Sequence, residues 1–322
     1  MAQFDLPLAQ LQQYLPDREE ASDFDTFWAD TLAEAHALAQ PTVRERSNPE
    51  LTGLVVEDVT FSGFGGDPIK GWFIRPAGAT EPLPCIVHYI GYSGGRGLAH
   101  QWTMHPSAGY AVFVMDTRGQ GSANLPGATA DPFGSGPQVA GKMSAGLGSP
   151  ETYYYRRVFT DAALAVDVVR SFPEVDPARV VVAGGSQGGG IALAAAGLCE
   201  GLAAALVDVP FLSHFRRALQ ITDASPFAEL KTYLISRRGH EEEVFRTLSY
   251  FDATNFAARA TAPALFSVAL CDAVCPPSTV YAAFNHYAGT QKDIAVYPYN
   301  GHEGGGPVQQ QAQLTFLADR LA

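Results

Sequence analysis

Short apolar runs alternate with longer helical patterns along residues 85–321, and this alternation restricts the possible folds more than any other feature. Continuous apolar runs of this length are typical of parallel strands that are covered on both faces. Strands that alternate with helices imply right-handed crossovers and a mostly parallel sheet with helices on both faces, so the predicted fold class is α/β. The predicted strands are residues 85–90, 111–116, 180–183, 204–209, 264–270 and 294–297, and the predicted helices are residues 153–171, 187–198, 279–287 and 308–321.

The region before this alternation has a different pattern. Phe24 and Trp28 begin an apolar stripe with steps of three and four residues, and acidic residues fall on the opposite face, which predicts an amphipathic helix. Two strand-like runs follow, at residues 54–61 and 69–75, and the turn-rich spacer between them predicts an antiparallel hairpin. We expect one domain over all 322 residues, with residues 1–50 as an N-terminal helical extension.

Residues 211–251 interrupt the alternation. They contain no good strand pattern and are rich in charged side chains such as Arg216, Glu229 and Lys231. We interpret this segment as a helical insertion that forms a lid over the carboxyl edge of the sheet.

Composition limits the partners and the cellular location. The formal net charge of −12 argues against nucleic acid as a partner, because binding to phosphates needs clustered Lys and Arg. The first 16 residues show no basic segment before an apolar stretch, so we expect no signal peptide. No run of about 18 apolar residues exists that could cross a membrane. The sparse cysteines lie in apolar surroundings, which favours buried thiols in a reducing cytoplasm.

Two of the cysteines allow a second interpretation. Cys271 and Cys275 are close enough in sequence to suggest a metal or redox pair. Their spacing is not Cys-x-x-Cys, and no histidine lies near them in the sequence. We therefore expect no metal and no other cofactor.

The pattern Gly-x-Ser-x-Gly occurs in Gly184-Gly185-Ser186-Gln187-Gly188, between an apolar strand and a helix of small residues. In this setting a sharp turn exposes the serine above the sheet, and the glycines leave room for closely crossing backbone. The helix dipole at Ser186 favours developing negative charge, and the amide of Gln187 is expected to face an oxyanion. A phosphate-binding loop is the alternative. The Lys of a Walker A loop is missing, but Asp208 at the end of the next strand leaves a dinucleotide-binding loop open.

A serine nucleophile needs a base, and the base needs an acid that fixes its tautomer. Asp272 directly follows one predicted strand, and His302 follows the last one. The order serine, acid, histidine, each in a loop after a strand, is that of a Ser-His-Asp triad on an α/β sheet. We therefore predict Ser186 as nucleophile, His302 as base and Asp272 as its partner, with Asp293 and Glu303 as alternative acids.

The second oxyanion donor is expected in the loop after the strand at residues 85–90. The amide of Tyr92 in this loop is the candidate, together with the amide of Gln187. Ser186 would attack an ester carbonyl while His302 accepts its proton, and water would later release the acyl group. The residues alone thus predict a serine esterase.

The motifs Arg118-Gly119-Gln120, Gly184-Gly185-Ser186-Gln187-Gly188 and His302-Glu303 follow one another along the chain. Together they resemble the signature of carbohydrate esterase family 7, the acetyl xylan esterases and cephalosporin C deacetylases of the α/β-hydrolase superfamily. The resemblance extends over nearly the whole chain. Further matching segments are residues 153–162, 171–177, 247–252, 275–280 and 296–299.

The resemblance implies an α/β-hydrolase fold and the removal of acetyl groups from small acetylated sugars, such as xylo-oligosaccharides, and from cephalosporin C. It also implies a cytoplasmic homohexamer whose active sites face an inner cavity. By the same resemblance, Tyr92 lines the acyl site, Pro226 and Phe227 form a pocket wall, and Arg118 and Gln120 belong to a hydrogen-bonded scaffold near the site.

The chain departs from the family pattern in two places. Residues 143–150, around Ala145, lack an Arg and an Asp that the family usually shows, and Ala123 stands where a second serine is usual. These changes leave loop packing, oligomer contacts and the leaving group open. The alternative functions are a broader short-chain carboxylesterase or a peptidase on the same fold, and a non-catalytic binding protein. The presence of all three triad candidates favours an enzyme.

Overall fold

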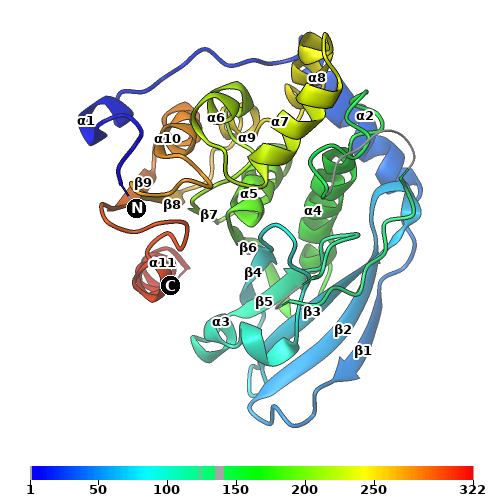
Figure 1. The fold of residues 1–322 in the computed structure, drawn as a ribbon. Coiled ribbons are helices and arrows are strands. Elements are labelled where there is room, and N and C mark those ends of the chain that lie inside the picture. Colours follow the sequence, from blue (N-terminus) through cyan, green and yellow to red (C-terminus); the bar gives the residue numbers. More distant parts are fainter. Residues whose placement is uncertain (1, 123–124, 135–140, 322) are drawn as a thin grey trace.

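A computed structural model describes residues 2–122, 125–134 and 141–321, and within these ranges it contains one nine-stranded sheet (Figure 1). The strand order is β1-β2-β3-β5-β4-β6-β7-β8-β9. Pairing is parallel from β5 to β9 and antiparallel from β1 to β5. The α/β prediction is therefore confirmed. The strands are β1 Val43–Ser47, β2 Leu54–Ser62, β3 Pro68–Pro76, β4 Leu83–Tyr89, β5 Ala111–Met115, β6 Val175–Gly185, β7 Ala204–Asp208, β8 Ala264–Ala269 and β9 Lys292–Tyr297.

Helices cover both faces of the sheet. Successive residues of its central strands therefore pack into two different apolar clusters, one on each face. In β4, Val87 packs into one apolar cluster and Ile86 into the other. The first cluster takes in α4 and α5, and the second takes in α11, which Figure 1 shows on the opposite side of the sheet. The helices that pack against the sheet include α4 Tyr154–Arg170, α5 Gln187–Leu198, α10 Pro277–His286 and α11 Gly306–Leu321, while α2 Phe24–Ala37 packs against α4 and α9 Ala253–Ala257 against α5 and α10.

The predicted elements differ from the structure mainly at their ends. β6 begins at Val175, five residues before the predicted run. The sequence does not predict this first part of the strand, because it contains Asp176 and Pro177 and carries no apolar pattern. The predicted hairpin at residues 54–75 forms as the antiparallel pair β2 and β3, with Leu54 opposite Pro76. The first 50 residues contain helices α1 (Leu8–Leu11) and α2, and they add the edge strand β1. Ala123 lies outside the described residues.

The segment between β7 and β8 carries helices α6 (Phe215–Ile221), α7 (Phe227–Ser236) and α8 (Glu241–Leu248), followed by α9. Short helical turns that were not predicted, η2 (Ala99–Trp102) and α3 (Met104–Ser107), follow β4. Among the helices of the described residues, none has the length and the apolar composition that a membrane crossing requires.

Candidate active site

Ser186 occupies a sharp turn between β6 and α5. Its backbone has φ 57° and ψ −123°, a conformation that L residues with side chains rarely adopt. Its N–H donates to the carbonyl of Asp208 at 3.0 Å, and its own carbonyl accepts from the N–H of Phe211 at 2.9 Å. A Cβ atom on Gly188 would lie 2.2 Å from the carbonyl oxygen of Tyr89, so only glycine fits where the backbones cross.

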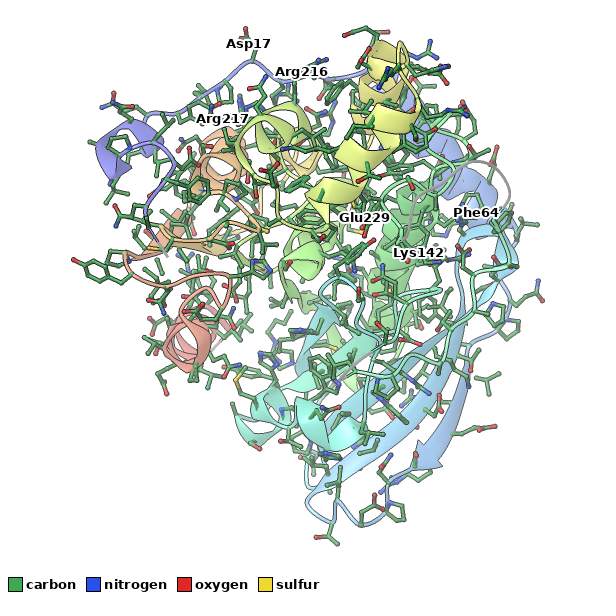
Figure 2. The ribbon with its side chains drawn as sticks, viewed as in Figure 1. Asp17, Phe64, Lys142, Arg216, Arg217 and Glu229 are labelled. Carbon is green, nitrogen blue, oxygen red and sulfur yellow. The ribbon has the colours of Figure 1, made fainter. Side chains whose placement is uncertain are left out.

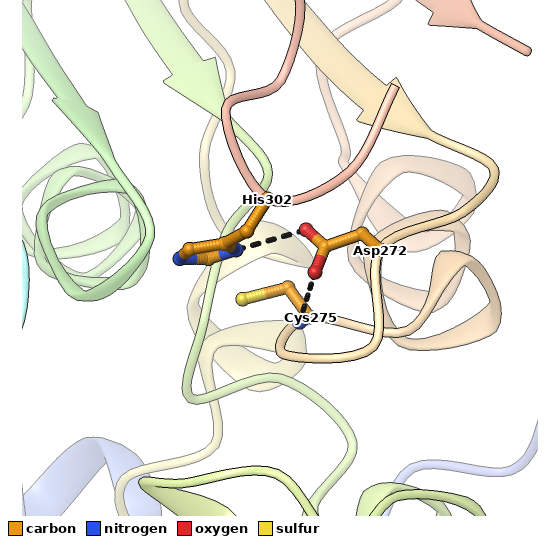
Figure 3. Close-up of side chains that lie close together, drawn as sticks. All are labelled: Asp272, Cys275 and His302. Carbon is orange, nitrogen blue, oxygen red and sulfur yellow. Dashed lines mark hydrogen bonds and ion pairs between the residues drawn. The ribbon is translucent and has the colours of Figure 1, made fainter. Parts of the chain in front are cut away.

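The side chains of Ser186, His302 and Asp272 form one hydrogen-bonded chain across the ends of β6, β9 and β8. His302 Nε2 lies 3.0 Å from Ser186 Oγ, and His302 Nδ1 lies 2.9 Å from Asp272 Oδ2. Figure 3 shows the second of these bonds together with the contact between Asp272 and Cys275. The structure thus brings the three predicted residues together in the order that a triad requires.

Asp272 is enclosed by donors. Its side chain is fully buried, and Oδ1 accepts from the backbone N–H groups of Val274 at 2.8 Å and Cys275 at 3.0 Å. The alternative acids lie elsewhere. Glu303 is exposed and accepts from Asn300 and from the amide of Gly301, and Asp293 is an exposed residue of β9.

The two candidate oxyanion donors are the amide of Gln187, directly after Ser186, and the amide of Tyr92, in the loop after β4. Among the described residues, the backbone N–H groups of Tyr92 and Gln187 have no acceptor in the protein. The buried side chain of Gln187 fixes the start of α5, because its Nε2 donates to the carbonyl of Ile90 at 3.1 Å and its Oε1 accepts from Tyr155 at 2.9 Å. Both amides are therefore available to a substrate.

The motif Arg118-Gly119-Gln120 supports the site through hydrogen bonds. Gln120 Oε1 accepts from the amide of Ser93 at 2.7 Å, and its Nε2 donates to Gln187 Oε1 at 2.8 Å, so this one side chain connects the loop of Tyr92 to the start of α5. Arg118 is fully buried and donates to Asp161 at 2.6 and 2.8 Å and to Asp67 at 2.8 Å. Burial raises the pKa of the Asp161 carboxyl, while the charge of Arg118 lowers it.

Replacement of Arg118 by Met is expected to lower the free energy of unfolding by about 3–5 kcal/mol, because Asp161 would remain buried without its cation. Urea unfolding followed by circular dichroism measures the loss. The control is Lys231→Met, which removes a cation whose partner Asp223 is 95% exposed and should cost less than about 1 kcal/mol. Equal losses in the two variants would contradict the assignment of Arg118 as a scaffold residue.

Asp272, Cys275 and His302 place possible metal-binding atoms within 4.8 Å of one another, the one such group among the described residues. Burial raises the pKa of the Cys275 thiol well above its usual range, and the charge of Asp272 raises it further. This disfavours the thiolate that would bind a metal. Cys271 and Cys275 are both free thiols. Asp208, on which the alternative of a dinucleotide-binding loop depends, accepts hydrogen bonds from Gln309 and Gln313 of α11.

The segment between β7 and β8, which the sequence predicts as a lid, connects to Tyr92 through aromatic rings. Phe227, at the start of α7, is fully buried, and its ring centroid lies 4.3 Å from that of Phe211. Phe211 in turn lies 6.4 Å from the ring of Tyr92. Phe211 therefore contacts both Tyr92 and Phe227, and Pro226 is the residue that precedes α7. A hollow of about 270 Å³ is lined by Tyr92 and Ser93 together with residues of the loops 119–122 and 141–142.

Sequence reasoning missed one contact of Tyr92. Its hydroxyl donates to the carboxylate of Glu229 on α7, at 2.8 Å to Oε2. From the sequence alone, Glu229 is only one of the many charged side chains of residues 211–251. No sequence signal pairs the two residues, because they are 137 positions apart.

Comparison with known proteins gives matches over almost the whole chain. The family model described as acetyl xylan esterase (AXE1) matches residues 1–320. The solved acetyl xylan esterase from Paenibacillus sp. R4 is 40% identical, with a TM-score of 0.92 and coverage of 98% of this chain and 100% of that one. Acetyl xylan esterase 1 from Thermoanaerobacterium sp. JW/SL YS485 is 32% identical, with a TM-score of 0.91 and coverage of 99% and 100%.

A curated relative matches over a shorter stretch. The acetyl esterase Axe7A of Xylanibacter ruminicola is 32% identical over 164 residues, which is 50% of this chain and 36% of that protein. The match thus spans about a third of that relative's length. The mixed sheet and its structural neighbours together confirm the predicted α/β-hydrolase fold.

Proposed function

The chain belongs to the acetyl xylan esterase family of carboxylic ester hydrolases, and from this premise we propose that it deacetylates small acetylated sugars such as xylo-oligosaccharides. The reaction would use Ser186, His302 and Asp272 as a triad and pass through an acyl-enzyme. The observation that carries the proposal is the distance of 3.0 Å between Ser186 Oγ and His302 Nε2, which is hydrogen-bond reach for a nucleophile and its base.

The proposed acylation follows from the positions of these atoms. Ser186 Oγ bonds to the acetyl carbonyl carbon while His302 Nε2 accepts the serine proton. The amides of Tyr92 and Gln187 donate to the resulting oxyanion, and the buried carboxylate of Asp272 stabilises the imidazolium. The bond from the carbonyl carbon to the sugar oxygen then breaks, and His302 gives its proton to the departing hydroxyl.

Deacylation would repeat these steps with water as the nucleophile. His302 accepts a proton from the water, the amides hold the second oxyanion, and acetate leaves as Ser186 regains its proton. The hollow beside Tyr92 has space for part of a sugar. Cephalosporin C as a further acetyl ester, a homohexamer and a cytoplasmic location belong to the same proposal, and the family resemblance supports them.

We expect the catalytic efficiency to fall as the acyl chain lengthens. Tyr92 would line the proposed acyl site, and its ring packs against Phe211, which packs against Phe227, so a longer chain would meet packed rings. From p-nitrophenyl acetate to butyrate, kcat/KM should fall by about tenfold or more, with octanoate lower still. Initial rates at matched concentrations measure this.

The substrates tested should also include acetylated xylo-oligosaccharides, sugar acetates and cephalosporin C. Nitrophenyl esters all share one leaving group, so they do not show which alcohol the enzyme prefers. Faster turnover of octanoate than of acetate would remove the acetyl preference and favour a broad carboxylesterase. Cleavage of an N-acyl peptide at a rate similar to that of the acetate would favour a peptidase.

A further inference from the structure

The hydroxyl of Tyr92 is fixed by two residues from outside its own loop, Glu229 and Lys142. It donates to the Glu229 carboxylate, at 2.8 Å to Oε2 and 3.0 Å to Oε1, and it accepts from the backbone N–H of Lys142. Met143 N–H donates to the same carboxylate at 3.2 Å. Figure 2 shows Glu229, in the first turn of α7, next to Lys142. The lid helix and the segment at residues 141–143 therefore meet at one tyrosine oxygen.

Glu229 is a partly buried carboxylate that has no ion-pair partner among the described residues. Burial raises the pKa of its carboxyl, and the hydrogen bonds from Tyr92 and Met143 lower it, since they stabilise the ionised form. Burial also raises the pKa of the Tyr92 phenol, which keeps this donor protonated. A hydrogen bond from a neutral donor to a carboxylate is stronger than one between neutral groups.

The backbone of the same loop is held from the opposite side. Ser93, the residue after Tyr92, donates its N–H to Gln120, and its carbonyl accepts from the amides of Gly121 and Ser122. The Tyr92 amide is attached to the same Cα atom as the fixed side chain and lies one residue before this anchor, and it has no acceptor in the described part of the protein. Contacts that hold both its own side chain and the next residue restrict the orientation of this free amide, which is what an oxyanion donor requires.

We propose that Glu229 is a positioning residue, which fixes the Tyr92 loop to the lid and so aims the Tyr92 amide at the oxyanion. This inference rests on the proposed esterase function. It assigns Glu229 no contact with the substrate. Its effect should therefore appear in the transition state, where the oxyanion develops, more than in substrate binding.

The test is a double-mutant cycle with p-nitrophenyl acetate. Tyr92→Phe removes a single oxygen and keeps the ring and the amide, and Glu229→Ala removes the acceptor. Each should lower kcat by about 10- to 100-fold, with KM changed by less than about threefold. The double variant should be no slower than the slower single variant, because each substitution breaks the same contact.

Conservative replacement and a matched control separate this role from general damage to the lid. Glu229→Gln keeps an oxygen that can accept from Tyr92, so it should lose less than about tenfold in kcat. Glu241→Ala removes an exposed carboxylate from α8 of the same lid segment and should leave kcat unchanged. Urea unfolding of every variant shows whether stability changes with activity.

A second measurement reports on the oxyanion itself. Ser186 Oγ can bond to the carbonyl carbon of 1,1,1-trifluoroacetone while its proton passes to His302, which gives a hemiketal with a charged oxygen. The inhibition constant of this ketone should rise in Tyr92→Phe and Glu229→Ala by about the same factor as kcat/KM falls. A role limited to folding would lower the fraction of active protein and leave the inhibition constant unchanged.

The outcomes distinguish this inference from the function on which it rests. Unchanged kcat in Tyr92→Phe and Glu229→Ala, or losses that multiply in the double variant, would overturn the role of Glu229 and leave the esterase proposal standing. Absence of acetyl ester turnover by the unsubstituted protein would overturn both.

Discussion

Replacement of Ser186 by alanine is expected to lower the kcat for acetyl esters by about 10⁴- to 10⁶-fold, because no other hydroxyl of the described residues hydrogen-bonds to His302. The substitution removes one oxygen that lies 3.0 Å from His302 Nε2. The backbone contacts of the turn remain, so the fold should persist. Steady-state hydrolysis of p-nitrophenyl acetate measures the loss, and labelling by a fluorophosphonate reports on the nucleophile directly.

Ser171→Ala serves as the matched control. Ser171 is an exposed serine at the end of α4, where its hydroxyl donates to the carbonyl of Val168. The control should keep full activity and full fluorophosphonate labelling. Labelling of Ser186→Ala at the level of the unsubstituted protein would reject Ser186 as the nucleophile, and an unlabelled protein with all serines present would favour a binding module.

Replacement of Asp272 by asparagine should cost about 10⁴-fold in kcat, although the side chain changes little in shape. Asp272 Oδ2 accepts from His302 Nδ1, which leaves Nε2 free to take the proton of Ser186. An amide nitrogen at this position would donate to Nδ1, and the proton would then sit on Nε2, where it blocks the base. The same nitrophenyl acetate assay measures the effect.

The alternative acids give the controls for Asp272. Asp293→Asn and Glu303→Gln change exposed carboxylates that lie outside the hydrogen-bonded chain, and both should stay within about threefold of the unsubstituted kcat. A loss of 10⁴-fold in Glu303→Gln, with Asp272→Asn active, would transfer the role to the neighbour of His302.

The positions of Ser186, Asp272 and His302 could be predicted because each follows a strand that its apolar composition makes recognisable. Parallel strands end at the same edge of a sheet, so residues far apart in sequence meet there. β7 and β8 show this most clearly, since both are buried on two faces and begin where the sequence predicts them. The motif around Ser186 and the order of the strands together were therefore enough to predict that these three residues lie close together.

Elements at the margin of the sheet could not be predicted in this way. β1 contains Arg44, Glu45 and Arg46, and most of its residues are exposed, because it pairs with β2 only. Its charged side chains give no apolar pattern, and the pairing itself holds the strand in place. The contact between Tyr92 and Glu229 was equally hidden, because it depends on where the lid folds back and not on local sequence.

The hydrogen bond between Tyr92 and Glu229 has a consequence for the engineering of this enzyme. The lid segment is inserted between β7 and β8. Exchange of this segment for that of a relative is therefore a direct route to new specificity. Such a chimera would separate Glu229 from a tyrosine that belongs to another part of the chain. Successful exchanges should therefore transplant the loop at residues 91–95 along with the lid, or retain Glu229 in the incoming helix. The two segments should therefore be exchanged together.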